Sequence, residues 1–193
     1  TELARLGIGT AQWGVAYGVN NSIGIAHKDD IDMMLAFAAK NSLIIDTAWA
    51  YGNSEEKIGS MLNHNSVKIV TKTKPIKTCS SQLNNQAQQV VDAVLTSISL
   101  LGGRQLYGVL VHQSNDLLGP HGYKLWRMLK QLKSKGLIEK VGCSFYSPDE
   151  YFKVAKIFDL DIVQIPYNIF DQRYMNSGMR EHAKRHWGAC CYK

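Results

Sequence analysis

Short apolar runs typical of buried β-strands alternate along the chain with longer segments whose apolar residues recur at helical spacing. The expected strands cover residues 6–12, 43–46, 67–72, 106–112, 138–144 and 161–165, and residues 188–192 begin a seventh. Two expected helices begin at about residues 29 and 148, and four others cover residues 53–62, 86–101, 123–135 and 176–186. Strand and helix alternate at intervals of roughly 25 to 35 residues, the order that builds a parallel sheet with right-handed crossovers.

Polar side chains stand at or near the carboxyl ends of the expected strands. They are, in chain order, Asp46, Lys72, His112, Ser144 and Gln164. Two architectures fit an alternating chain of this kind: an open doubly wound sheet and a closed (β/α)8 barrel of the TIM type. A barrel would gather these side chains at one mouth, whereas an open sheet would spread them along an edge.

The segment 44–59 joins a strand to a helix through a turn that carries a phenol. Its strand ends at Asp46, Tyr51 lies in the turn, and Asn53 or Ser54 can cap the helix that follows. Two glutamates in the first helical turn suit the positive end of the helix dipole. A charged group at the end of a buried strand, followed by an irregular turn, is where α/β proteins bind ligands.

Size and composition favour a single globular domain over residues 1–193. The chain has 193 residues, 45% of them hydrophobic and 20% charged, which is enough for one sizeable core. No stretch approaches the roughly 20 apolar residues of a membrane span, and the first residues lack a secretory apolar region, so we expect a cytoplasmic protein without membrane contact. The four cysteines show no framework spacing, and we expect reduced thiols without disulfides.

The net charge of +6 raises the question of a nucleic-acid partner. The lysines and arginines are spread over several helices, and those of residues 123–135 share their helix with leucines at core spacing. We interpret them as solvated helix faces and expect no nucleic-acid partner. An anionic small ligand would also gain from a positive field.

An acid, a phenol, an amine and an imidazole in one water-shielded mouth can transfer a proton to a carbonyl. A free tyrosine has a pKa of about 10, and a lysine ammonium close to Tyr51 would lower it. Asp46 can hold Lys72 in place through an ion pair, and His112 can donate a hydrogen bond to a substrate carbonyl. None of these groups donates a hydride, so a reduction needs a nicotinamide cofactor. The side chains that end the fifth and sixth strands are candidate partners for its carboxamide.

Five ordered motifs resemble the aldo-keto reductase family in its expected order. They are the Asp46/Tyr51 spacing and the segments 70–72, 109–112, 141–144 and 161–164, and the likeness runs from residue 6 to about 173. This resemblance implies a (β/α)8 barrel that binds NADPH or NADH and reduces an aldehyde or ketone to an alcohol. Residues 9–14 and 166–173 resemble bacterial members of the family linked to sugar or surface-polysaccharide metabolism.

The resemblance also implies a role for each candidate residue. Tyr51 would be the proton donor, supported by Lys72 and Asp46, and His112 would orient the substrate carbonyl. The cofactor-binding residues would be Asp46, Ser144 and Gln164, with Gly9 and Thr10 lining the floor of the nicotinamide site.

Two features depart from the family pattern. Phe145 stands where many members have asparagine, so one carboxamide contact is absent or comes from backbone. The sequence also stops at Lys193, whereas such barrels usually run to about 250 residues. We therefore expect that the part of the barrel after about strand seven is missing or that a partner fills the gap, and that the open edge favours self-association.

Several other residues have competing interpretations. Lys74 lies on the same side of its strand as Lys72, but past the expected strand end and next to a proline, so we favour Lys72 as the site lysine. Trp13, Trp49 and Tyr17 could line the mouth as aromatic walls, and ordinary packing is the alternative for Trp49.

The C-terminal segment carries a weak metal-like pattern. His182 and His186 are four apart on an expected helix with Cys190 and Cys191 nearby, a spacing seen in zinc sites. Basic residues between the two histidines indicate an exposed helix face, so we expect no metal site. Tyr192 could stack on a nicotinamide ring from the seventh strand.

Three functions remain to be distinguished. The first is NAD(P)H-dependent reduction of a small carbonyl compound. The second is a nicotinamide-binding or regulatory module without productive turnover, motivated by Phe145 and by the missing third of the barrel. The third is a sugar-phosphate isomerase or lyase on the same barrel, which would need no nicotinamide, and the Tyr51/Lys72 pairing argues against it.

Overall fold

A parallel sheet that follows the chain order forms the centre of the protein. The computed structural model describes residues 6–19, 21–62, 67–76, 85–187 and 190–192, with side chains described up to residue 183. Within these residues seven parallel strands lie side by side in the order β1 to β7. Their bounds are β1 Gly7–Gly9, β2 Ile44–Asp46, β3 Lys68–Lys72, β4 Leu106–Val111, β5 Ile138–Ser144, β6 Ile162–Ile165 and β7 Cys190–Tyr192.

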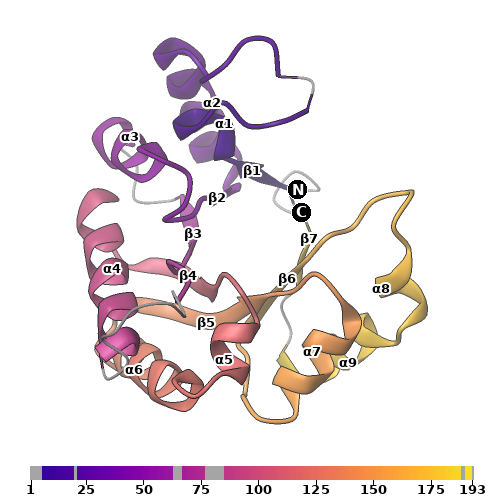
Figure 1. Ribbon diagram of the computed structural model, residues 1–193. Helices are drawn as coiled ribbons and strands as arrows, with labels where there is room; N and C mark the ends of the chain where they lie inside the picture. Colours follow the sequence, from indigo (N-terminus) through magenta and orange to yellow (C-terminus); the bar gives the residue numbers. More distant parts are fainter. Residues whose placement is uncertain (1–5, 20, 63–66, 77–84, 188–189, 193) are drawn as a thin grey trace.

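The sheet curls as a barrel wall does. Figure 1 shows the strands turning about a common centre, with the helices outside them. A doubly wound sheet would reverse its strand order at a switch point, and no reversal occurs among the described strands. The expectation of a TIM-type barrel that stops after about strand seven is confirmed, with β1 and β7 as the edge strands of the described sheet.

Most helices lie where the apolar periodicity predicts them. The bounds of the helices are α1 Ala11–Gly14, α2 Lys28–Asn41, α3 Ser54–Met61, α4 Gln86–Leu100, α5 Asn115–Leu118, α6 Gly122–Ser134, α7 Pro148–Ala155, α8 Arg173–Asn176 and α9 Met179–Trp187. The short helices α1, α5 and α8 were not expected, because a single turn carries no periodic pattern. In the described part of the chain, no helix combines the length and apolar character needed to cross a membrane.

The helix expected over residues 176–186 begins later, at Met179, as α9. Gly178, with a positive φ of 71°, separates α8 from α9. A left-handed residue of this kind interrupts helical hydrogen bonding, and glycine adopts it without steric cost.

The main hydrophobic core lies between the outer face of the sheet and the helices. Alternate strand residues point to this side, and Ile45, Val109, Val141 and Val163 are all fully buried there. The inner face holds a smaller apolar cluster of Val70, Leu110 and Ile162 from three different strands. Burial of both faces explains why the strands read as continuous apolar runs rather than as alternating ones.

Glu55 is a buried carboxylate on the outer side of the sheet. The Thr71 hydroxyl of β3 donates to it over 2.5 Å, and the Ser97 hydroxyl of α4 donates over 2.8 Å. Burial raises the pKa of this carboxyl, while the two hydroxyl donors lower it in part. Glu55 thus joins α3 to β3 and α4 and does not face the inner side of the sheet.

Candidate active site

The strand register places the expected catalytic side chains on the inner face of the sheet. Asp46 pairs with Val70, which lies two residues before Lys72 on β3. Lys72 pairs with Leu110, which lies two residues before His112 at the end of β4. Because residues two apart on a strand share a face, the acid, the amine and the imidazole all stand at the carboxyl end of the same face.

The fifth and sixth strands continue this row. Ser144, the last residue of β5, pairs with Gln164 of β6, and both side chains are buried. On the first strand, Gly9 pairs with Asp46. A side chain built at Gly9 would meet nothing within 4 Å, so open space lies beside the Asp46 carboxylate.

Lys72 and Asp46 form an ion pair at the centre of this row. The Lys72 ammonium lies 2.6 Å from an Asp46 carboxylate oxygen and donates a second hydrogen bond to the Thr47 carbonyl over 2.9 Å. The lysine side chain is fully buried, while that of Asp46 is 21% exposed. A buried ammonium needs such partners, because an uncompensated charge away from water is costly.

Tyr51 lies beside this ion pair. The centre of its ring is 5.3 Å from the Lys72 ammonium. The turn that carries it is fixed by backbone hydrogen bonds, from Tyr51 to the Ala48 carbonyl over 3.0 Å and from Trp49 to the Lys72 carbonyl over 3.2 Å. The structure therefore brings Asp46, Tyr51 and Lys72 together, as the sequence predicts.

The net shift in the pKa of Tyr51 is upward, not downward as expected from the nearby Lys72 ammonium. Burial raises the pKa of Tyr51 to about 12, and the Asp46 carboxylate and the neighbouring phenols of Tyr146 and Tyr17 contribute in the same direction. The Lys72 ammonium, which is paired with Asp46 at 2.6 Å, does not offset this rise in the Tyr51 pKa. Tyr51 is therefore a protonated phenol at neutral pH, the state that a proton donor requires.

A close backbone approach holds the Tyr51 turn against the loop after β1. Gly52 has a φ of 58°, and a side chain there would overlap the Gly14 carbonyl. A side chain on Gly14 would in turn overlap the carbonyl of Tyr51. These two glycines let the chain pass close enough to place the phenol, and neither was singled out from the sequence.

Thr10 and Ser54 tie the same two loops together. The Ser54 hydroxyl donates to the Thr10 hydroxyl over 2.9 Å, and the Thr10 backbone donates to the Asp46 carbonyl over 3.0 Å. The expected side-chain cap of α3 is absent, because Ser54 donates to Thr10 and the N-cap residue Asn53 makes no side-chain cap. Thr10 is fully buried and its hydroxyl bonds within the protein, so of the expected floor residues only Gly9 leaves open space.

The backbone of His112 is anchored to the end of β3. Its N–H donates to the Thr73 hydroxyl over 3.2 Å, and the Thr73 N–H donates to the Leu110 carbonyl over 2.9 Å. These two hydrogen bonds continue the β3–β4 contact one residue past the strands. They fix the backbone position from which the His112 side chain extends. Thr73 is a positioning residue that the sequence motifs did not indicate.

Phe145 does not enter the site. Its side chain is fully buried on the outer side and meets the Tyr151 ring edge-on, with centroids 5.4 Å apart. Its N–H donates to the Gln164 carbonyl over 2.9 Å, and its carbonyl accepts from the Tyr174 hydroxyl over 3.2 Å. The position that differs from the family pattern is thus used to pack β5 against α7 and α8.

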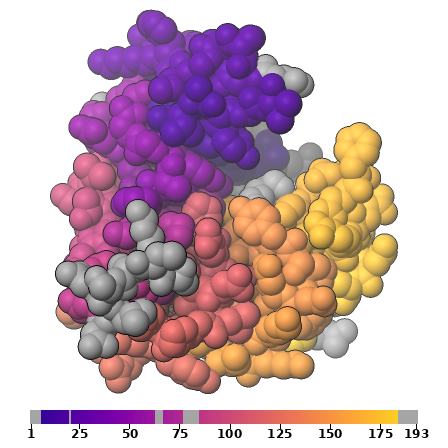
Figure 2. Space-filling view, viewed as in Figure 1, coloured from indigo at the N-terminus to yellow at the C-terminus, as the bar shows by residue number. Residues whose placement is uncertain are grey.

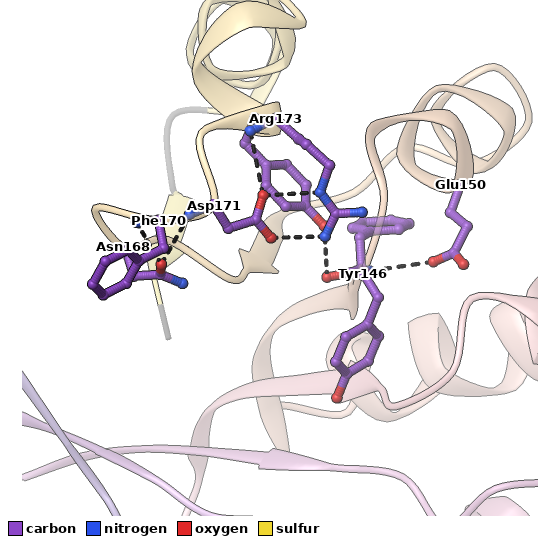
Figure 3. A network of polar contacts seen from close by, with 8 residues as sticks. Tyr146, Glu150, Asn168, Phe170, Asp171 and Arg173 are labelled. Carbon is purple, nitrogen blue, oxygen red and sulfur yellow. Dashed lines mark hydrogen bonds and ion pairs between the residues drawn. The ribbon is translucent and has the colours of Figure 1, made fainter.

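Tyr146 is a site residue that sequence reasoning missed. It lies two residues after Ser144, it is 51% exposed, and its phenol raises the pKa of Tyr51. Its N–H donates to Glu150 over 3.2 Å, as Figure 3 shows. It follows the end of β5, where the alternation of side chains is no longer assured, so the sequence pattern does not mark it.

The loop after β6 leads into α8 and is held by polar contacts. Figure 3 shows its polar network: the Arg173 guanidinium pairs with Asp171 over 2.7 Å, and Asn168 accepts from two backbone N–H groups. The Arg173 guanidinium lowers the pKa of Asp171. Figure 2 shows a notch in the outline between the indigo N-terminal residues and the yellow residues around α8.

The aromatic residues expected to line the mouth separate into two groups. Trp13 is 2% exposed and belongs to the main core, so its expected place as a mouth wall is wrong. Trp49 is 42% exposed, and the Lys74 ammonium lies 5.7 Å from the centre of its ring. Tyr17 is exposed and lies near enough to Tyr51 to raise its pKa.

The remaining predicted residues have other roles or lie outside the described side chains. His182 takes part in a hydrogen bond of 2.8 Å between its Nδ1 and the Tyr151 hydroxyl. Cys143 is a buried thiol whose sulfur donates to the Ser144 carbonyl over 3.4 Å. The side chains of His186, Cys190, Cys191 and Tyr192 lie outside the described set, as does residue 79.

Comparisons with known proteins agree with this geometry. The sequence model of the Aldo/keto reductase family matches residues 5–191. A curated relative, the aldo-keto reductase YhdN of Bacillus subtilis, is 28% identical over 192 residues, which cover 95% of this chain and 55% of the relative. The chain thus spans about half the length of that protein.

Solved structures show the same fold. A structure described as an aldo-keto reductase from Pseudomonas aeruginosa superposes with a TM-score of 0.74 at 25% identity, covering 97% of this chain and 72% of that one. The aldo-keto reductase AKR2E4 of Bombyx mori, in complex with NADP, superposes with a TM-score of 0.66 at 17% identity, covering 98% and 62% of the two chains.

Proposed function

The chain belongs to the aldo-keto reductase family, and from this membership and its site geometry we propose that it reduces an aldehyde or ketone to an alcohol with NADPH or NADH. The observation that carries the proposal is the Asp46–Lys72 ion pair, 2.6 Å long, beside the ring of Tyr51. An isomerase or lyase would need a base but no protonated phenol next to an ammonium. In this proposal residues 1–193 act as one barrel-type domain.

The proposed chemistry assigns one step to each side chain. Tyr51 holds a firmly bound proton and releases it to the carbonyl oxygen as that oxygen gains alkoxide character, because an alkoxide is a much stronger base than a phenolate. The Lys72 ammonium stabilises the phenolate that remains, and Asp46 keeps Lys72 charged and in place. His112 orients the carbonyl by donating a hydrogen bond to its oxygen.

The residues at the ends of β5 and β6 fit a nicotinamide. The Gln164 Oε1 atom is buried and has no hydrogen-bond partner among the described residues. A carboxamide N–H₂ would supply the missing donor, and the Ser144 hydroxyl next to it in register can bond the carboxamide carbonyl. The position beside Gly9, where an added side chain would meet nothing within 4 Å, is the place that we propose for the nicotinamide ring. When bound, the dihydronicotinamide supplies the hydride.

The structural relatives support this choice of cofactor. The Bombyx mori relative is in complex with NADP, and a mutant of Gox0644, at 19% identity and a TM-score of 0.67, is in complex with NADPH. That this chain also binds a nicotinamide cofactor is part of the proposal.

Self-association at the edge of the sheet is a further part of the proposal. β1 is an edge strand of the described sheet, and Gly7 and Gly9 on it are exposed. Edge strands offer backbone groups that a second copy can pair with. Light scattering over a range of concentrations should detect a concentration-dependent dimer, and a constant monomer mass would rule it out.

A panel of neutral and charged aldehydes and ketones, each mixed with NADPH or NADH and the 193-residue chain, tests the function. We expect carbonyl-dependent loss of reduced-nicotinamide absorbance and loss of that activity in Tyr51→Phe. Tyr123→Phe, which removes an exposed hydroxyl from α6, is the matched control and should keep the activity. Cofactor binding without turnover of any carbonyl would favour the regulatory module instead.

A further inference from the structure

The structure places a second lysine at the rim of the same mouth. Lys74 lies two residues past Lys72, and the Thr73 N–H still bonds to β4 over 2.9 Å, so the extended backbone continues through Thr73. Lys74 therefore falls on the inner side of the sheet, like Lys72. Its ammonium lies 5.7 Å from the centre of the Trp49 ring.

Trp49 belongs to the turn that carries the proposed proton donor. It lies two residues before Tyr51, and its N–H donates to the Lys72 carbonyl over 3.2 Å. The indole is 42% exposed, so a bound molecule can reach it. Lys74 and Trp49 thus form a cationic and an aromatic contact next to Tyr51.

The short segment that carries Lys74 is held at both ends. Thr73 is bonded to β4 as described, and the N–H of Ile76 donates to the Asp116 carboxylate of α5 over 3.2 Å. Pro75, between Lys74 and Ile76, has a restricted φ. The position of the Lys74 backbone is therefore fixed before any substrate binds, which lowers the entropy cost of using it.

Lys72 and Lys74 differ in how their charges are used. The Lys72 charge is matched by Asp46 inside the site. The ion pairs found among the described residues involve Lys72, Lys130, Lys133 and Arg173, and Lys74 takes part in none of them. A cation–π contact at an exposed aromatic ring is weak, so an anion can replace or join it.

We propose that Lys74 makes the site prefer carbonyl substrates that carry an anionic group, a carboxylate or a phosphate, with Trp49 packing against the carbons between that group and the carbonyl. This inference rests on the proposed reductase function and adds the substrate class to it. A hydrogen bond from an ammonium to an anionic oxygen is about twice as strong as a neutral one, so one lysine at this place is enough to set a preference.

Matched substrate pairs test the inference. 4-Oxobutanoate is compared with butanal, and glyceraldehyde 3-phosphate with glyceraldehyde, each at saturating NADPH. We expect kcat/KM to be higher for at least one anionic member, and the pair that shows the larger ratio identifies carboxylate or phosphate as the preferred group. Lys74→Gln should lower that ratio about tenfold, mainly through KM, whereas Lys74→Arg should keep most of it.

Lys124→Gln is the control for the change in net charge. Lys124 is exposed on α6, so removing its charge should leave the ratio within twofold of the wild-type value. Equal kcat/KM for both members of both pairs, or a ratio that Lys74→Gln leaves unchanged, would overturn the inference.

Calorimetry separates this inference from the proposed function. If no carbonyl is turned over, the reductase proposal fails, but the anion site can still be tested by binding. For this test, 4-oxobutanoate and glyceraldehyde 3-phosphate are each titrated into the wild type and into Lys74→Gln, both with NADP bound. The site is supported if either anion binds to the wild type and Lys74→Gln weakens that binding about tenfold. Absent binding of both, or equal binding to the two proteins, rejects it.

Discussion

The Lys72 ammonium and the Asp46 carboxylate are 2.6 Å apart, with the lysine side chain fully buried and the aspartate side chain 21% exposed. Removing one member leaves the other as an uncompensated charge in a partly dry site. Lys72→Met should therefore lower the free energy of unfolding by about 2–4 kcal/mol, measured by urea denaturation.

A double-mutant cycle isolates the pair. The double variant Asp46→Asn/Lys72→Met has no uncompensated charge. Its loss in free energy of unfolding should therefore be at least about 1 kcal/mol smaller than the sum of the losses in the two single variants. Strictly additive losses would show that the two side chains are not energetically coupled. Lys124→Met, at an exposed position on α6, should change the stability by less than about 0.5 kcal/mol.

The raised pKa of Tyr51 predicts how this residue titrates. Burial moves the pKa from 10.0 to about 12, so the folded chain should keep the Tyr51 proton at a pH where ordinary tyrosines ionise. Wild type and Tyr51→Phe should show the same phenolate absorbance at about pH 10.5. An additional phenolate in the wild type at that pH would contradict the buried, protonated donor. The stability contributed by this proton is complete below pH 10 and is lost as the pH rises toward 12.

Much of this site could be predicted from local sequence patterns. Each strand appears as an apolar run because both of its faces are covered, and the first polar residue after the run marks its carboxyl end. That rule placed Asp46, Lys72, Ser144 and Gln164 within a residue of their observed strand ends and His112 just past β4. Parallel neighbours in a curled sheet then bring the ends of successive strands together.

The rest depended on contacts between segments far apart in the chain. Nothing near Trp13 in the sequence shows that its ring enters the main core, and the acidity of Tyr51 depends on burial that only the folded chain creates. Tyr146 was missed because it follows the strand end, where alternation is no longer assured. The sequence predicts the pairing of Lys72 with Asp46, but not the contact of Lys74 with the Trp49 ring.

The close approach of Gly52 to Gly14 predicts a large effect from a small substitution. Gly52 has a φ of 58°, and an added methyl group would overlap the Gly14 carbonyl. Gly52→Ala should therefore destabilise the chain by about 1–3 kcal/mol and shift the Tyr51 turn. If the reductase proposal holds, kcat should fall at least tenfold.

A second glycine with positive φ is a control that separates the overlap with Gly14 from the cost of a left-handed backbone conformation. Gly136 also has a positive φ, of 74°, but a side chain there meets nothing within 4 Å. Gly136→Ala should cost only about 1 kcal/mol and leave kcat unchanged. Equal losses of kcat in the two variants would show that the contact with Gly14 does not place the phenol.

The unpaired Gln164 oxygen predicts opposite effects on cofactor binding and stability. Gln164→Leu removes a buried acceptor that has no partner among the described residues, so the stability should be unchanged or rise by up to about 1 kcal/mol. The affinity for NADPH, measured by calorimetry, should fall about tenfold, because the carboxamide loses its acceptor. Gln89→Leu on the exposed side of α4 should leave the affinity unchanged. Loss of stability without loss of affinity would indicate a purely structural glutamine.

Asp116 is a buried carboxylate that holds the segment next to the site. It is 8% exposed and accepts a hydrogen bond from the Ile76 N–H over 3.2 Å. Burial raises its pKa from 3.8 to about 6, and the bond from Ile76 lowers it only in part. The folded chain therefore binds more protons than the unfolded chain between these two pH values.

This difference in proton binding predicts that stability falls as the pH rises from about 4 to 7. Asp116→Asn keeps a carbonyl oxygen to accept from Ile76 but cannot ionise, so it should flatten the decrease by about 1–2 kcal/mol, measured by thermal or urea unfolding at each pH. The pKa of Glu55 is also raised by burial and contributes a decrease of the same sign, which remains in the variant. Asp32→Asn, at an exposed position of α2, should leave the pH profile as it is. A profile that Asp116→Asn leaves unchanged, or that it makes steeper, would mean that the Asp116 carboxyl titrates as it does in the unfolded chain.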